Sequence, residues 1–111
     1  MKRQDIKNSI FEEYLGDSPY LRVLDFLIEG REFDYSMTEV ARGAKVGWSV
    51  FTKIWKQLFD RKLIVKTREI GNAKLFKLNK ENLAVQKLIK FDSELIKLEN
   101  NKIINKPLIR V

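Results

Sequence analysis

The chain has 111 residues, of which 44% are hydrophobic and 33% are charged, and its formal net charge is +7. This composition is typical of one soluble globular domain, and no apolar run approaches the roughly 18 residues that a membrane-spanning helix needs. Cys and His are both absent and no secretory leader is evident, so we expect a cytoplasmic protein without disulfides or cofactors, and an enzyme is a poor hypothesis.

Two amphipathic helices are predicted in the first thirty residues. Residues 3–14 place apolar side chains at helical spacing, namely Ile6, Ile10, Phe11 and Tyr14. Gly16 would end this N-terminal helix. In the following stretch SPYLRVLDFLIEG, Ser18 is a candidate N-cap, Pro19 occupies the first helical position and Gly30 marks the end.

A short helix and a longer one are predicted next. Ser36 and Glu39 have the spacing of a capping box, which predicts a helix over residues 37–44. Gly43 and Gly47 would let the chain turn sharply before the next helix begins. That helix has one buried stripe, formed by Phe51, Ile54, Trp55 and Leu58.

A β-hairpin and a long helix follow. The runs LIVKTREI and AKLFKLN flank Gly71-Asn72, a tight-turn signal. A turn centred there predicts three pairs on one face, Glu69 with Lys74, Thr67 with Phe76 and Val65 with Leu78, and leaves Lys66, Arg68 and Lys77 on the other. Asn79 or Asn82 can cap a helix over residues 83–99. The tail, residues 100–111, contains a Pro and has no clear period, so we expect a loosely ordered or partner-dependent end.

The stretch TEVARGAKVGWSVFTKIWKQLFDRKLI carries a family resemblance. It is similar to the helix-turn-helix of MarR/ArsR-type winged-helix transcription regulators in its apolar positions, Val40-Ala41, Val46, Phe51, Trp55, Leu58 and Leu63-Ile64. The continuation TREIGNAKLFKLNKEN looks most like small archaeal members. The sequence departs from the family pattern in two places, because Gly47 stands where Ser or Thr usually caps the recognition helix, and Lys62 where Gly usually precedes the wing.

The resemblance implies an α+β, mainly α, winged helix-turn-helix with a two-stranded wing and extra terminal helices. It divides the chain into an N-terminal helix or arm (1–17), a DNA-binding domain (18–80), a C-terminal dimerisation helix (81–99) and a tail (100–111). The implied function is sequence-specific binding of double-stranded DNA to regulate transcription, with the recognition helix in the major groove and the basic wing on the adjacent backbone or minor groove.

Positive charge supports this reading because it is concentrated in the middle of the chain. Residues 36–80 carry a net charge of +8, whereas residues 1–35 carry −3 and residues 81–111 carry +2. Solubility is the simplest explanation of a Lys-rich surface, but the concentration of positive charge in one block favours a polyanionic partner. The candidate DNA-binding residues are Lys45, Trp48, Ser49, Thr52, Lys53 and Lys56 on the recognition helix, and Lys66, Arg68, Asn72, Lys74 and Lys77 on the wing.

The two tryptophans are predicted to differ in role. Trp55 lies on the apolar stripe and belongs to the core. Trp48 falls with polar and basic residues in the first turn, where it either contacts DNA or packs against the preceding helix or the hairpin. Arg68 is the best wing candidate for insertion into the minor groove.

A homodimer is expected because the last helix has apolar residues on more than one face, enough to contact its own domain and a second chain. The candidate interface residues are Ile6, Ile10, Phe11, Leu88, Phe91, Leu95 and Leu98. The alternative is that both terminal helices complete a monomeric core. No effector site is evident, so a small-molecule ligand stays unknown.

Other functions stay open at this stage. A winged helix also serves as a protein-interaction module, and fold alone does not decide between these roles. An exposed Trp48 also suits a binder of single-stranded nucleic acid or RNA, because aromatic rings stack on unpaired bases. A carboxylate enzyme ranks last, since no acidic pair has a recognisable spacing.

Overall fold

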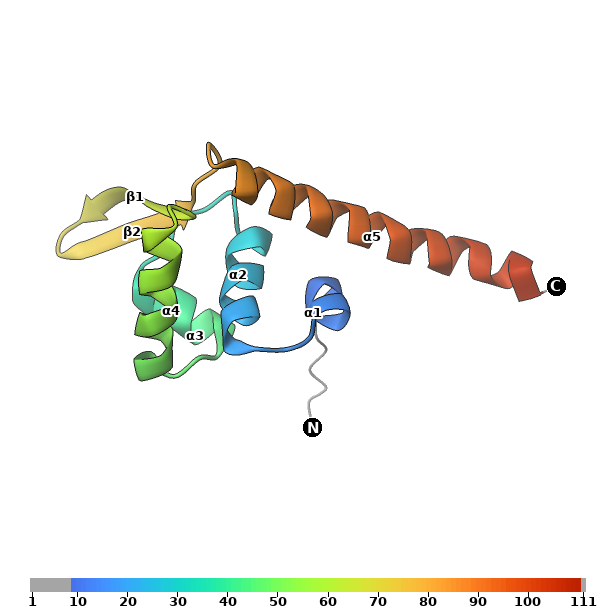
Figure 1. Cartoon of the computed structure of the whole chain (residues 1–111), viewed down its shortest axis with the longest axis horizontal. Helices are drawn as coiled ribbons and strands as arrows, with labels where there is room; N and C mark the ends of the chain where they lie inside the picture. Colours follow the sequence, from blue (N-terminus) through green and yellow to red (C-terminus); the bar gives the residue numbers. More distant parts are fainter. Residues whose placement is uncertain (1–8, 111) are drawn as a thin grey trace.

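The protein is a helical domain with one hairpin and a long final helix (Figure 1). The computed structural model describes residues 9–110, and the side chains of residues 9–102. Its elements are α1 (Ile10–Leu15), α2 (Pro19–Glu29), α3 (Met37–Ala44), α4 (Trp48–Asp60), β1 (Ile64–Ile70), β2 (Ala73–Leu78) and α5 (Leu83–Arg110). The hairpin and the far end of α5 point in opposite directions from the group formed by α2, α3 and α4. This order confirms the predicted fold class.

Side-chain caps set the starts of α1, α2 and α3, and two of these caps confirm predictions. The Ser18 hydroxyl accepts a hydrogen bond from the Leu21 amide at 3.1 Å, ahead of Pro19. Ser36 and Glu39 form the expected capping box, with reciprocal bonds of 3.2 and 2.9 Å. In α1, Ser9 is the N-cap and the helix begins at Ile10, so the part predicted before it, including Ile6, lies outside the described residues.

The core forms where α2, α3 and α4 meet the base of the hairpin. All four residues of the predicted α4 stripe are buried there: Phe51, Ile54, Trp55 and Leu58. They pack with apolar side chains from the neighbouring elements, among them Val23, Leu27, Ile28, Val40, Ile64 and Leu78. Burial of this stripe leaves the opposite side of α4 exposed. None of the described helices is both long enough and apolar enough to cross a membrane.

The turn between α3 and α4 differs from the prediction. Gly43 lies inside α3, and a Cβ atom built there would come within 2.2 Å of the Phe26 ring. Glycine is therefore needed at this position for close packing rather than for a bend. The bend is made by Lys45, which adopts a left-handed conformation with φ of 60°. Gly47 is the N-cap of α4, and it supplies no side-chain cap.

The hairpin has the predicted turn but only part of the predicted register. The pairs nearest the turn, including Glu69 with Lys74, are as expected. A bulge at Thr67 then shifts β1 by one residue, so that Lys66 lies opposite Phe76. Because side chains alternate along a strand, a shift of one residue exchanges the two faces of β1 beyond the bulge.

Burial explains why the bulge is needed. It places Ile64 opposite Leu78, and both side chains are 2% exposed, whereas the predicted partner Val65 is 36% exposed. The prediction that Lys66, Arg68 and Lys77 share one face is therefore wrong: Lys66 lies on the face of Phe76, and Lys77 on the other.

The last helix is longer than predicted. Asn82 is its N-cap, because its side-chain oxygen accepts from the Ala84 amide at 2.7 Å. The helix then continues past Glu99 to Arg110, so the predicted end of this helix at Glu99 is wrong. Pro107 lies within this helix, although Pro lacks the amide that an interior helical residue donates.

Candidate nucleic-acid interface

The first turn of α4 presents an exposed aromatic side chain. Trp48 is 53% exposed, and its ring stacks on Phe51 with centroids 5.5 Å apart and an interplanar angle of 26°. Phe51 in turn stacks on the buried Trp55 at 5.2 Å, and Trp55 meets Phe76 edge-on at 5.3 Å. Trp48 therefore packs against the core with one side of its ring, and about half of its side chain remains exposed to solvent.

The polar residues predicted for this face lie beside Trp48, as expected for one face of a helix. Ser49, Lys53 and Lys56 are exposed, and Thr52 is half-buried. The Thr52 hydroxyl donates to the Ser49 carbonyl at 3.1 Å, and the Lys56 ammonium pairs with Asp60 at 2.8 Å. Lys56–Asp60 is an exposed pair of the kind that contributes little to stability, so it does not prevent exchange with a phosphate.

The N-terminus of α4 is open to an anion. Gly47 has no side chain to cap the first amides of α4, and exposed amides at a helix N-terminus favour negative charge. Lys53 lies one turn beyond Ser49 on the same face and forms no ion pair with any residue in the described part of the chain. This face can therefore offer main-chain amides, a hydroxyl, an indole and an ammonium group to one anionic partner.

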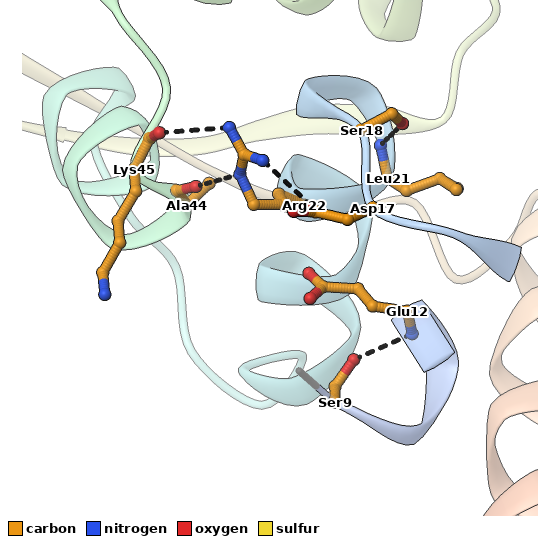
Figure 2. Close-up of polar contacts among 8 residues, drawn as sticks. All are labelled: Ser9, Glu12, Asp17, Ser18, Leu21, Arg22, Ala44 and Lys45. Atoms are coloured by element: carbon orange, nitrogen blue, oxygen red, sulfur yellow. Dashed lines mark hydrogen bonds and ion pairs between the residues drawn. The ribbon is translucent and has the colours of Figure 1, made fainter. Parts of the chain in front are cut away.

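Arg22 of α2 holds the turn that precedes α4 (Figure 2). Its Nε donates to the Ala44 carbonyl at 3.0 Å and its Nη2 to the Lys45 carbonyl at 3.3 Å. The Asp17 carboxylate accepts from Nη1 at 2.9 Å. Arg22 thus satisfies carbonyls at the end of α3 and fixes the left-handed turn that exposes Lys45. Sequence reasoning missed Arg22, because nothing local links it to a turn more than twenty residues away.

The wing carries its basic residues on both faces. Lys66 pairs with Glu69 at 2.7 Å across the bulge, and this pair lowers the pKa of the Glu69 carboxyl. Lys74 lies opposite Glu69, and Lys77 lies on the other face, opposite Val65. Asn72 is exposed at the tip. The predicted wing residues are therefore accessible, but they do not form one continuous stripe.

Arg68 is bound within the chain. Its Nε and Nη2 donate to the two oxygens of Asp34 at 3.0 and 3.2 Å, and the Thr67 hydroxyl donates to Asp34 at 2.6 Å. The hydrogen bond from Arg68 is the main reason that the pKa of Asp34 lies below its usual range. Asp34 belongs to the loop before α3, so this contact ties the wing to that loop. Sequence reasoning missed Asp34, since no local pattern connects it to Arg68.

The residues predicted for a dimer interface divide into two groups. Phe11 and Leu95 are 1% and 5% exposed, so the chain already buries them between α1 and α5. Phe91 meets Phe11 edge-on at 6.3 Å and is still 39% exposed, and Leu98 is 51% exposed. The other described members, Ile10 and Leu88, are half-buried. The exposed apolar part of α5 is the surface that remains for a second chain.

Solved structures share this architecture. The homodimeric winged helix-turn-helix DNA-binding domain Mb0332 of Mycobacterium bovis, described as a possible ArsR-family regulator, matches with a TM-score of 0.51 and 14% identity, over 87% of this chain and 81% of that one. The chain has a winged-helix fold. No family model and no curated protein matches the sequence, so the likeness is one of structure.

Two further neighbours support the same assignment of fold. NadR, solved in complex with 4-hydroxyphenylacetate, matches with a TM-score of 0.61 and 20% identity, over 89% of this chain and 67% of NadR. The MarR family transcriptional regulator SPO1453 of Silicibacter pomeroyi matches with a TM-score of 0.57 and 17% identity, over 86% and 65% of the two chains. These neighbours agree with the MarR/ArsR-type resemblance of the sequence.

Proposed function

We propose that the chain is a sequence-specific double-stranded DNA-binding transcription regulator that acts in the cytoplasm, as a homodimer and without catalysis. The observation that carries the proposal is the exposed face of α4, where Trp48, Ser49 and Lys53 lie beside a helix N-terminus that has no side-chain cap. On a winged-helix fold, this is the helix that enters the major groove. The structural neighbours described by function are transcription regulators rather than enzymes.

In this proposal α4 reads base edges and the wing holds the backbone. Trp48, Ser49, Thr52 and Lys53 would contact bases, sugars or phosphates, while Lys45 and Lys56 flank them. Lys66, Asn72, Lys74 and Lys77 would contact the neighbouring backbone or minor groove. Arg68 reaches DNA only if it leaves Asp34, so we now assign it first to holding the wing in position.

The proposed dimer uses the part of α5 that the chain leaves exposed. Phe91, Ile96 and Leu98 are each at least 39% exposed and belong to one long helix that extends away from the winged-helix core (Figure 1). A single recognition helix contacts few base pairs, and pairing through α5 would present two of them to one duplex.

The test is fluorescence anisotropy of a labelled duplex of about 30 base pairs over a salt series, with wild type, Lys53→Ala and the control Lys87→Ala. Lys87 is an exposed residue of α5 outside the proposed interface. We expect wild type to bind, and the slope of log affinity against log salt to fall by about 0.9 for Lys53→Ala and to stay unchanged for Lys87→Ala. Absence of duplex binding at low salt would overturn the proposal and favour a protein-interaction module.

The exposure of Trp48 favours one second candidate, binding of single-stranded nucleic acid. An indole that is half exposed at the start of a basic helix can stack on an unpaired base. Competition of the labelled duplex with an unlabelled single strand of the same length separates the two functions. A single strand that competes more strongly than duplex would favour the second candidate.

A further inference from the structure

An acidic cleft lies on the side of α2 that faces α1 and the end of α3. Its volume is about 520 Å³, within the range of small-molecule sites. The N-cap Ser9 and Glu12 line it at α1, Asp25 and Glu29 at α2, and Ala44 and Lys45 at the end of α3. Figure 2 shows Ser9 and Glu12 on one side of this space and Arg22 with the Ala44–Lys45 turn on the other.

Arg22, a cationic residue that lines the cleft, is already engaged. The Arg22 guanidinium forms its three hydrogen bonds with Asp17 and with the carbonyls of Ala44 and Lys45. The Lys45 side chain is exposed at the rim. Asp25 and Glu29 lie one turn apart on the same face of α2, and no ion pair joins either of them to another described residue.

Asp25 is the residue that the described structure leaves unsatisfied. Its side chain is 7% exposed, and its Oδ1 has no hydrogen-bond partner in the described structure. A buried carboxylate oxygen without a partner is destabilising, and such groups are rare in native proteins. Burial is the main cause that raises the pKa of Asp25, Glu12 and Glu29, and neighbouring carboxylates add to it, while a hydrogen bond with Ser9 partly offsets the rise at Asp25. A cation with N–H donors would supply the missing hydrogen bond and reduce the repulsion.

We propose that this cleft binds a linear aliphatic polyamine. Ammonium groups separated by short methylene chains match carboxylates placed one helical turn apart, and Phe26 and Ala44 provide apolar wall for the methylenes. A metal ion fits less well, because the described His, Cys, Asp and Glu residues form no group of three that is suited to hold one. The site does not depend on the proposed DNA binding and is tested without DNA.

The net charge of the chain makes this proposal specific. At +7 the protein as a whole repels polycations, so saturable polyamine binding would report a local acidic site rather than general attraction. The experiment is isothermal titration of the full chain with spermidine, and with magnesium chloride as a second titrant. The variants are Asp25→Asn and Glu29→Gln. The matched control is Glu94→Gln, which neutralises an exposed acidic side chain of α5 outside the cleft.

We expect saturable binding of spermidine that weakens about tenfold or more in Asp25→Asn and in Glu29→Gln, since each variant removes a hydrogen bond to a charged group, and that is unchanged in Glu94→Gln. Circular dichroism verifies that each variant is folded. If Asp25→Asn does not fold, Glu29→Gln, at a more accessible position, keeps the test decisive. No saturable heat with spermidine, equal affinity in all variants, or displacement of spermidine by magnesium would overturn the proposal.

Discussion

Replacement of Lys62 by Gly is expected to stabilise the protein. Lys62 has φ of 61°, a left-handed conformation that glycine adopts readily and that side chains with a Cβ resist. The fold imposes this conformation, because the Lys62 carbonyl accepts from the side-chain amides of Asn79 and Asn82, both at 3.0 Å. These two bonds join the start of the wing to the start of α5.

The magnitude follows from two opposing effects. The left-handed conformation costs a residue with a Cβ about 1–2 kcal/mol, and the greater freedom of Gly in the unfolded chain offsets about 0.4–1 kcal/mol of the gain. The net stabilisation should be about 1 kcal/mol, which corresponds to a rise in melting temperature of about 4 °C for a domain of this size. The Lys62 side chain is exposed, so its removal leaves no cavity.

The assay is urea unfolding of wild type, Lys62→Gly and Lys62→Ala. The Ala variant removes the same ammonium group but keeps the Cβ, so the difference between the two variants isolates the backbone effect. Equal stability of the Gly and Ala variants would refute the claim that the conformation of Lys62 is strained. A gain shared by both would instead point to charge repulsion in the basic wing region.

Two further predictions concern charged groups. The first is that Arg68 positions the wing through Asp34, so Arg68→Ala and Asp34→Ala should weaken duplex binding to a similar extent. The double variant should lose little more, and the slope of log affinity against log salt should not change. A slope lower by about 0.9 in Arg68→Ala alone would mean that Arg68 contacts a phosphate. The second prediction is a rise in stability as the pH is lowered from neutral toward the ordinary carboxyl pKa. The raised pKa values of Asp25, Glu12 and Asp92 mean that the folded state takes up protons before the unfolded state does. The gain is complete only below the ordinary carboxyl pKa and is lost as the pH rises through the raised values, whereas the lowered pKa of Asp34 favours its ion pair in this range. Urea unfolding over a pH series tests this, and Asp25→Asn should flatten the dependence; stability that falls from the start of acidification in wild type would contradict it.

Local signals in the sequence predicted most of the fold. The caps at Ser18 and Ser36 and the apolar stripe of α4 each depend on residues within a few positions of one another, and each was confirmed. The bulge at Thr67 was not predictable, because it depends on the burial of Ile64 opposite Leu78. Local spacing cannot report a requirement that arises only when the wing packs on the core.

The candidate site shows the same division. Helical spacing was sufficient to separate the buried Trp55 from the exposed Trp48, and the structure confirms that difference in burial. Helical spacing could not identify the partners of the basic residues, because these partners lie far away in the sequence. Asp34 binds Arg68 from 34 positions away, and Arg22 of α2 binds the turn before α4. Such long-range polar contacts decide which of several surface cations is available to a ligand.

The stack of Trp48, Phe51 and Trp55 gives the protein an intrinsic optical reporter. The exposed indole should emit at longer wavelength and be quenched by iodide in solution, while the buried indole should emit at shorter wavelength and be shielded. A partner that covers the first turn of α4 should therefore shift and protect one emission component and leave the other unchanged. Stern–Volmer quenching would then reveal contact at that turn without any attached label.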